Sequence, residues 1–95
     1  MDKPLIVVNF KTYETAMGDS ALTLAKAMDN FTDRDFRMIA VVSAFDLSTI
    51  SNSVSSVEVW SQHLDPVGKG SHTGWLEPDL AIHHGAVGTI INHAE

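Results

Sequence analysis

The sequence predicts an α/β fold in which parallel strands alternate with helices. Short apolar runs recur along the 95-residue chain, and helical spacing of apolar residues follows most of them. Glycine, proline and small polar residues separate these segments, as expected for turns. The predicted order is β-α-β-α-β-α-β, with four strands and three helices. Such alternation favours a parallel sheet with right-handed crossover connections.

The first strand is predicted over residues 4–9, where four apolar side chains follow one another. A run without polar interruption is typical of a strand that is buried on both faces of a parallel sheet. The next helix is predicted over residues 20–28, with Asp19 as its N-cap. Its apolar residues recur at i, i+3, i+4 and i+7 and share one face. They are Ala21, Leu24, Ala25 and Met28.

The second strand is predicted over residues 38–42, which are all apolar. A short helix is expected directly after it. Ser43 can cap this helix, because Asp46 lies three residues further on in the pattern of a capping box. Leu47 and Ile50 would then face the core.

The third strand is predicted over residues 57–62, which mix β-branched, aromatic and polar side chains. A turn-rich segment, residues 65–74, follows it. Pro78 fits the first turn of a third helix, and Gly85 suits the position just after its end. The fourth strand is predicted over residues 89–92.

The composition fits one small domain without disulfide bonds. The chain has no cysteine, which excludes disulfides and thiol catalysis. The net charge of −6 argues against non-specific binding to nucleic acid or to an anionic membrane surface. The apolar run near the N-terminus is too short for a signal peptide or a membrane span. We therefore expect a cytoplasmic protein that binds neither nucleic acid nor membranes.

Residues that can do chemistry follow the first and fourth predicted strands. Asn9 and Lys11 come after the first strand, and Asn92, His93 and Glu95 come after the fourth. Ligands of parallel α/β proteins bind at the edge where the strands end. A lysine can hold a phosphate or an oxyanion, and a histidine can polarise a carbonyl near neutral pH. The alternative is a solvated lysine at a strand end and a frayed acidic tail.

Residues 68–74 are rich in glycine but match neither common nucleotide-binding motif. The dinucleotide fingerprint G-x-G-x-x-G would need glycine where the chain has Thr73. A P-loop would need serine or threonine directly after Lys69, where Gly70 stands instead. We interpret the segment as a shaped surface loop that can reach a partner.

Five histidines raise the question of a metal site. His83 and His84 are adjacent, and on a helix their side chains would point about 100° apart, which makes a shared ion difficult. His63 and His72 flank the glycine-rich segment, but no third ligand follows at a recognisable spacing. We therefore expect no metal ion and no cofactor.

Taken together, these segments resemble the triosephosphate isomerase family. The resemblance rests on Asn9-x-Lys11 after the first strand and on Asn92-His93-x-Glu95 after the fourth. Residues 65–75 resemble the third βα loop of archaeal-type members, and residues 85–89 resemble the approach to the fourth strand. The similarity covers essentially the whole chain. It implies that residues 1–95 are an incomplete domain, the N-terminal half of a TIM (β/α)8 barrel, which in full has eight strands and roughly 250 residues.

The resemblance also implies catalytic roles. Asn9 and Lys11 would bind the substrate, with Lys11 stabilising negative charge on the phosphate and the enediolate. His93 would be the electrophile that polarises the carbonyl, a role for which this family is the standard example. Glu95 would pair with Lys11. Thr73 would reach the active site of a neighbouring subunit.

The implied reaction interconverts dihydroxyacetone phosphate and glyceraldehyde 3-phosphate, a step of glycolysis and gluconeogenesis. The implied assembly is a homodimer or homotetramer that forms through residues 65–75. In the family, a glutamate after strand six is the general base, and this chain has no counterpart for it. We therefore expect no useful activity from the isolated chain, because nothing would take the proton from carbon.

Two other interpretations remain open. The chain could be a non-catalytic half-barrel that self-associates or serves as a binding module, because its first and fourth strands would have open, apolar edges. Another phosphate-handling α/β enzyme would require both strand-end motifs to agree by chance.

Overall fold

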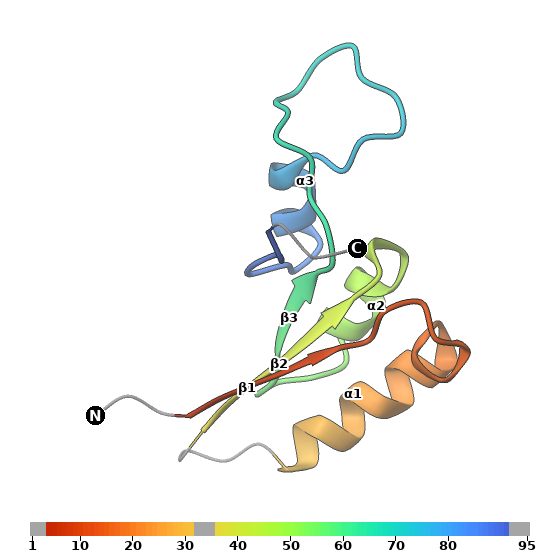
Figure 1. Ribbon diagram of the computed structural model, residues 1–95, viewed down its shortest axis with the longest axis vertical. Coiled ribbons are helices and arrows are strands. Elements are labelled where there is room, and N and C mark those ends of the chain that lie inside the picture. The colour runs from red at the N-terminus through yellow and green to blue at the C-terminus, as the bar shows by residue number, and fades with distance from the viewer. Residues whose placement is uncertain (1–3, 32–35, 92–95) are drawn as a thin grey trace.

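Three parallel strands in the order β1-β2-β3 form the sheet of the computed structural model (Figure 1). The structure describes residues 4–31 and 36–91. The strands are β1 (Leu5–Asn9), β2 (Arg37–Val42) and β3 (Glu58–Ser61). The helices are α1 (Asp19–Phe31), α2 (Leu47–Ser51) and α3 (Pro78–His83), and short 3₁₀ turns cover Glu14–Ala16 and Ala44–Asp46. The predicted α/β class with a parallel sheet is confirmed.

The predicted fourth strand is present only in outline. Within the described residues, Thr89 forms an isolated parallel bridge with Ser61 of β3. The backbone amide of Val87 donates to the carbonyl of Val59 at 3.1 Å, so the segment runs beside β3 before it reaches Thr89. The predicted place of this strand is therefore right, but a strand over residues 89–92 is not formed in the part of the chain that the structure describes. Residue 92 lies outside that part.

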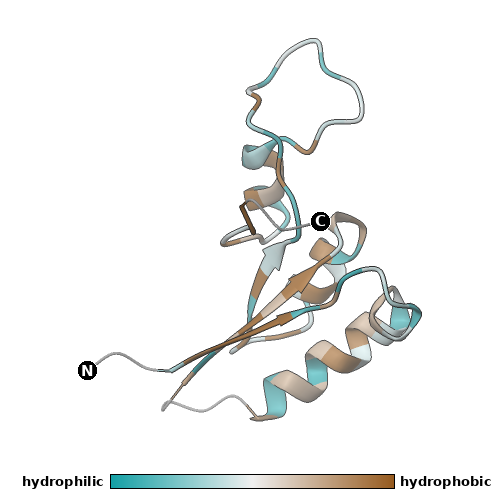
Figure 2. Cartoon of the chain, viewed as in Figure 1, coloured by the Kyte–Doolittle hydropathy of each residue, from teal (hydrophilic) through white to brown (hydrophobic). Residues whose placement is uncertain are grey.

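The first strand is much more exposed than its sequence indicated. β1 is hydrophobic along its length (Figure 2), yet Leu5, Ile6 and Val7 are 51%, 41% and 47% exposed. Among the described residues, β1 pairs only with β2, in a register that places Leu5 opposite Arg37. The prediction of a strand buried on both faces is wrong for this structure, because β1 is an edge strand with one apolar face uncovered.

The first two helices follow the predicted pattern closely. α1 begins at Asp19 itself, so Asp19 is the first helical residue and not the cap. The predicted inner face is confirmed, since Ala21 and Ala25 are fully buried. The Ser43 hydroxyl accepts a hydrogen bond from the amide of Phe45 at 3.2 Å, as expected of a cap. Leu47 and Ile50 are buried, and α2 packs against α1 and β3.

The third helix has the predicted boundaries. Pro78 is its first residue, and the carboxylate of Glu77 accepts from the amides of Asp79 and Leu80 at 2.7 and 3.1 Å. Gly85 follows the helix with φ 102°, a left-handed conformation that favours glycine. A side chain at this position would also collide with Ser51, so Gly85 fits both the turn and the space.

The core lies between the sheet and the helices α1 and α2. It is built from small and β-branched residues, which allow the helices to approach the sheet closely. Its fully buried members include Phe10, Ala21, Ala25, Ala40, Val42 and Ile50. In the described part of the chain, no helix is long and apolar enough to cross a membrane.

Asp29 of α1 holds the turn that leads into β3. Its Oδ1 accepts from the amides of Ser56 and Val57 at 2.8 and 3.0 Å, and its Oδ2 accepts from the amide of Ser55 at 3.1 Å. Partial burial raises the pKa of Asp29, but the amides of Ser56, Val57 and Ser55 outweigh this effect and bring the pKa below its usual 3.8. This carboxylate therefore ties the end of α1 to the start of β3.

Candidate functional site

Lys11 stands at the edge of the sheet where the strands end. It lies two residues beyond β1, directly after Phe10, which is 1% exposed and anchors the turn in the core. The backbone of Lys11 has φ 52°, and among the described residues no other non-glycine residue has a positive φ. A left-handed conformation costs an ordinary residue about 1–2 kcal/mol, so the surrounding structure must impose it.

Two side chains fix the backbone of Lys11. The Oδ1 of Asn9 accepts from the Lys11 amide at 2.9 Å. The Nε2 of Gln62 donates to the Lys11 carbonyl at 2.7 Å, although the two residues are 51 positions apart. The predicted pairing of Asn9 with Lys11 is thus formed, with Asn9 orienting the lysine backbone.

Gln62 is a site residue that the sequence reasoning missed. It follows β3 directly, and its amide continues the ladder by donating to the Val42 carbonyl at 3.0 Å. The signal that could have found it is its position, because a polar residue after a buried strand is also what singled out Lys11. Its reach across the sheet was not visible in the chain.

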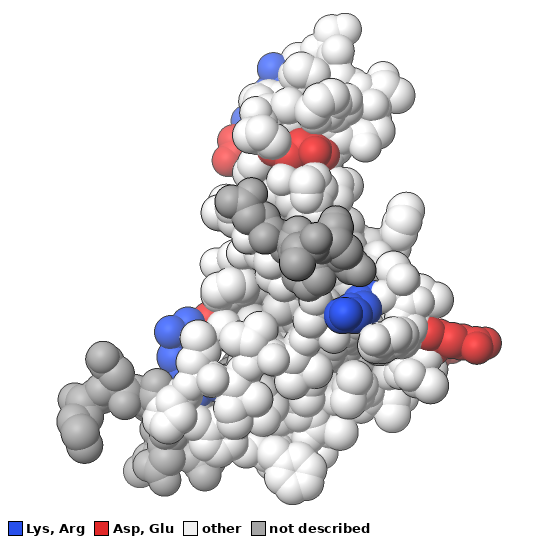
Figure 3. All heavy atoms as spheres, viewed as in Figure 1, with Lys and Arg blue, Asp and Glu red and all other residues white. Residues whose placement is uncertain are grey.

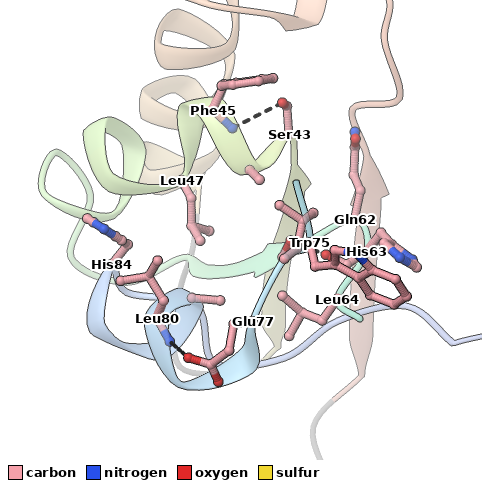
Figure 4. A pocket seen from close by; sticks show the side chains of 14 residues that line it. Ser43, Phe45, Leu47, Gln62, His63, Leu64, Trp75, Glu77, Leu80 and His84 are labelled. Atoms are coloured by element: carbon pink, nitrogen blue, oxygen red, sulfur yellow. Dashed lines mark hydrogen bonds between the residues drawn. The ribbon is translucent and has the colours of Figure 1, made fainter. Parts of the chain in front are cut away.

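A groove of about 390 Å³ adjoins this site (Figure 4). Its walls are mostly apolar and come from α2, α3 and the segments that follow β2 and β3. Figure 4 shows Gln62, His63 and Trp75 on one side of the groove and Leu47, Leu80 and His84 on the other. Gln62 thus lines this groove and also holds Lys11.

Residues 65–75 form a loop that projects away from the sheet (Figure 1). Its neck is closed by Asp65, whose amide donates to the Leu76 carbonyl at 2.9 Å and whose Oδ2 accepts from the Leu76 amide at 2.6 Å. The Leu76 amide, and then the hydrogen bond with His63, lower the pKa of Asp65 below its usual value. Thr73 lies in this loop and is exposed.

The charges on the surface are sparse. On the face displayed in Figure 3, basic side chains form separate spots with uncharged surface between them. A lysine in such surroundings acts on an anion locally and not as part of an extended positive field.

The histidines are spread over the structure. His63 contacts Asp65 through Nε2 and Oδ1 at 2.8 Å, and the rings of His83 and His84 lie edge to face with centroids 5.4 Å apart. In residues 4–31 and 36–91, no three His, Asp or Glu side chains converge as metal ligands.

The structure brings together only part of the predicted site. Asn9 and Lys11 meet at the sheet edge, and Gln62 joins them. His93 and Glu95 lie outside the described residues, so their place next to Lys11 stays a prediction.

Comparisons with known proteins agree on one family. The family model for triosephosphate isomerase matches residues 4–95. The triosephosphate isomerase of Archaeoglobus fulgidus is 40% identical, over 96% of this chain and 41% of that protein. The corresponding protein of Methanothermus fervidus is 38% identical, over 100% of this chain and 43% of that protein. The chain thus spans roughly two-fifths of the length of these curated relatives.

A solved structure shows how the fold fits. The triosephosphate isomerase structure from Bartonella henselae superposes with a TM-score of 0.80 at 24% identity. The match covers 98% of this chain but 39% of that one. The described strands and helices therefore correspond to part of a TIM barrel, as the sequence predicted.

Proposed function

The chain belongs to the triosephosphate isomerase family, and from this membership we propose that its residues supply the N-terminal part of an isomerase active site. The reaction is the interconversion of dihydroxyacetone phosphate and glyceraldehyde 3-phosphate, a step of glycolysis and gluconeogenesis. One observation carries the proposal, namely the left-handed backbone of Lys11 at the carboxyl edge of the sheet. Strained residues of this kind cluster at ligand and catalytic sites.

Lys11 and Asn9 form the anion-binding part of this site. A triose phosphate is a small dianion, and a lysine ammonium group is a compact charge that can follow its oxygens. Asn9 spends its Oδ1 on the Lys11 amide, so its contribution includes setting the direction of the lysine. Lys11 also stabilises negative charge that develops on the enediolate oxygen.

His93 and Glu95 complete the contribution of this chain. His93 polarises the substrate carbonyl, and Glu95 pairs with Lys11. Both follow the segment that runs beside β3, since Thr89 already pairs with Ser61. Parallel strands that end at one edge bring such residues to the same side of a sheet.

The 95 residues alone do not catalyse the reaction in this proposal. Isomerisation requires a base that removes a proton from carbon, and the family places that glutamate after strand six. The chain acts in a homo-oligomer, and Thr73 in the loop of residues 65–75 reaches a neighbouring active site. Neither a metal nor a cofactor takes part.

A chimera tests the proposal. The chain replaces the matching residues of the Archaeoglobus fulgidus relative, which is 40% identical to it, so that the rest of the barrel is supplied. We expect isomerase turnover from the chimera in a coupled assay and none from the 95-residue chain. Lys11→Ala and His93→Ala should each abolish most of it, while Glu14→Ala, at an exposed position, should not. A folded but inactive chimera would refute the proposal, as would turnover by the chain alone that His93→Ala removes.

A second candidate is a half-barrel that self-associates. The exposed apolar side chains of β1, at a strand edge that no described residue pairs with, favour it. Sedimentation of the chain should then show concentration-dependent association, and Val7→Lys should weaken it. A monodisperse monomer that unfolds cooperatively would reject this candidate.

A further inference from the structure

Lys11 adopts a conformation that its own residue type opposes. Its φ of 52° places the Cβ atom against the following peptide group, which glycine would avoid. The preceding residue is fixed independently, because Phe10 is buried and its amide donates to the Val41 carbonyl at 2.9 Å. The strain is therefore confined to the peptide groups on either side of Lys11.

The two hydrogen bonds on Lys11 differ in origin. Asn9 lies two residues away, and a local turn of this kind forms wherever asparagine can accept from a nearby amide. Gln62 comes from the far side of the sheet, since β2 separates β1 from β3. The amide nitrogen of Gln62 must face the Lys11 carbonyl, because the flipped side chain would oppose two oxygen acceptors.

Gln62 is itself firmly held. It is half-buried, and its backbone amide donates to the Val42 carbonyl at 3.0 Å. Val42 is fully buried at the end of the central strand. The Gln62 side chain thus starts from a rigid point and reaches across the end of β2 to Lys11.

We propose that Gln62 is a positioning residue that maintains the left-handed backbone of Lys11 and thereby fixes where the lysine ammonium group lies, a role that rests on the proposed function for its effect on catalysis. A lysine side chain has several rotatable bonds, so the direction of its Cα–Cβ bond decides which space the ammonium group samples. Without the Gln62 bond, Lys11 can relax to a negative φ, and its side chain then leaves the carboxyl edge in another direction.

Kinetics of the chimera test the catalytic part. Gln62→Met keeps the length of the side chain but removes the donor, and Gln62→Glu puts an acceptor against the carbonyl. We expect kcat/KM to fall about 10- to 100-fold in Gln62→Met, because small displacements of a catalytic group have effects of this size. Gln62→Glu should fall at least as far at neutral pH.

A double-mutant cycle separates positioning from a general structural role. If Gln62 acts through Lys11, Gln62→Met should change kcat/KM less than about twofold in a Lys11→Ala background. Losses that multiply independently would overturn the proposal, as would a Gln62→Met chimera with unchanged kcat/KM.

The backbone of Lys11 gives a readout that needs no activity. In the 95-residue chain, NMR couplings and the intraresidue Hα–HN contact distinguish positive from negative φ. We expect a positive φ at Lys11 in the unsubstituted chain and its loss in Gln62→Met. A positive φ that survives the substitution, or that is absent from the start, overturns the proposal. If the chimera is inactive but the φ depends on Gln62, the proposed function fails and the positioning role stands.

Discussion

Replacing Asp29 should destabilise the fold by an amount that its contacts allow us to estimate. The carboxylate accepts hydrogen bonds from three successive amides, those of Ser55, Ser56 and Val57. A hydrogen bond to a charged group contributes about 1.5–3 kcal/mol when it is shielded. Here solvent reaches the site and can replace part of each bond, so the sum is far below three full bonds. We expect Asp29→Ala to lower the free energy of unfolding by about 2–3 kcal/mol.

Asp29→Asn should have a smaller effect that depends on pH. Asparagine keeps one acceptor oxygen, which can retain the contacts with Ser56 and Val57, so a loss of about 1 kcal/mol is expected at pH 7. The pKa of Asp29 is lowered in the folded state, so its stabilisation is complete above the unfolded pKa. It disappears as the pH falls through the lower, folded value. The difference between the original chain and Asp29→Asn should therefore shrink below about pH 4.

Urea denaturation at several pH values measures both effects. Midpoints should shift at constant slope, which shows a change in stability alone. Glu14→Ala is the control, since it removes an exposed carboxylate and should change stability by no more than about 0.5 kcal/mol. The reasoning is refuted if Asp29→Ala costs no more than the control. It is also refuted if the gap to Asp29→Asn stays constant or grows as the solution is acidified.

Three further substitutions test other contacts. Gly85→Ala should cost about 2–3 kcal/mol in urea denaturation, because alanine resists φ 102° and its Cβ would meet Ser51; a cost below about 0.5 kcal/mol would contradict this. Asp65→Ala should speed amide exchange at Leu76 and in the loop of residues 65–75, because the neck of that loop loses its acceptor; unchanged protection would show that the neck closes without it. Glu58→Gln should cost less than about 1 kcal/mol, because its two contacts with an arginine, at 2.7 and 2.8 Å, lie at the surface; a larger loss would point to a buried role.

The local elements could be predicted because their signals are short-range. The apolar face of α1 follows from the helical repeat, and Ala25 on that face is fully buried. Ser43 caps the turn after β2 because a hydroxyl two residues away can always reach an amide. Gly85 ends α3 because the left-handed turn there needs no partner elsewhere in the chain.

The exposure of β1 could not be predicted in the same way. Its apolar run indicates burial, and burial depends on what covers the strand and not on the strand itself. Leu5 and Val7 remain about half exposed, because the described chain covers one face and pairs one edge. The positions of His93 and Glu95 beside Lys11 stay a prediction from family resemblance.

By itself, the sequence determined which segments are helices and strands, that the sheet is parallel, and that Asn9 and Lys11 stand at the end of the first strand. The tertiary structure alone decided what holds Lys11. The partner is Gln62, 51 residues away, and the contact exists because β2 sets the spacing between two strands that do not touch. Periodicity and capping act over a few residues, whereas a hydrogen bond across a sheet depends on register and strand order, which only packing of the whole sheet establishes.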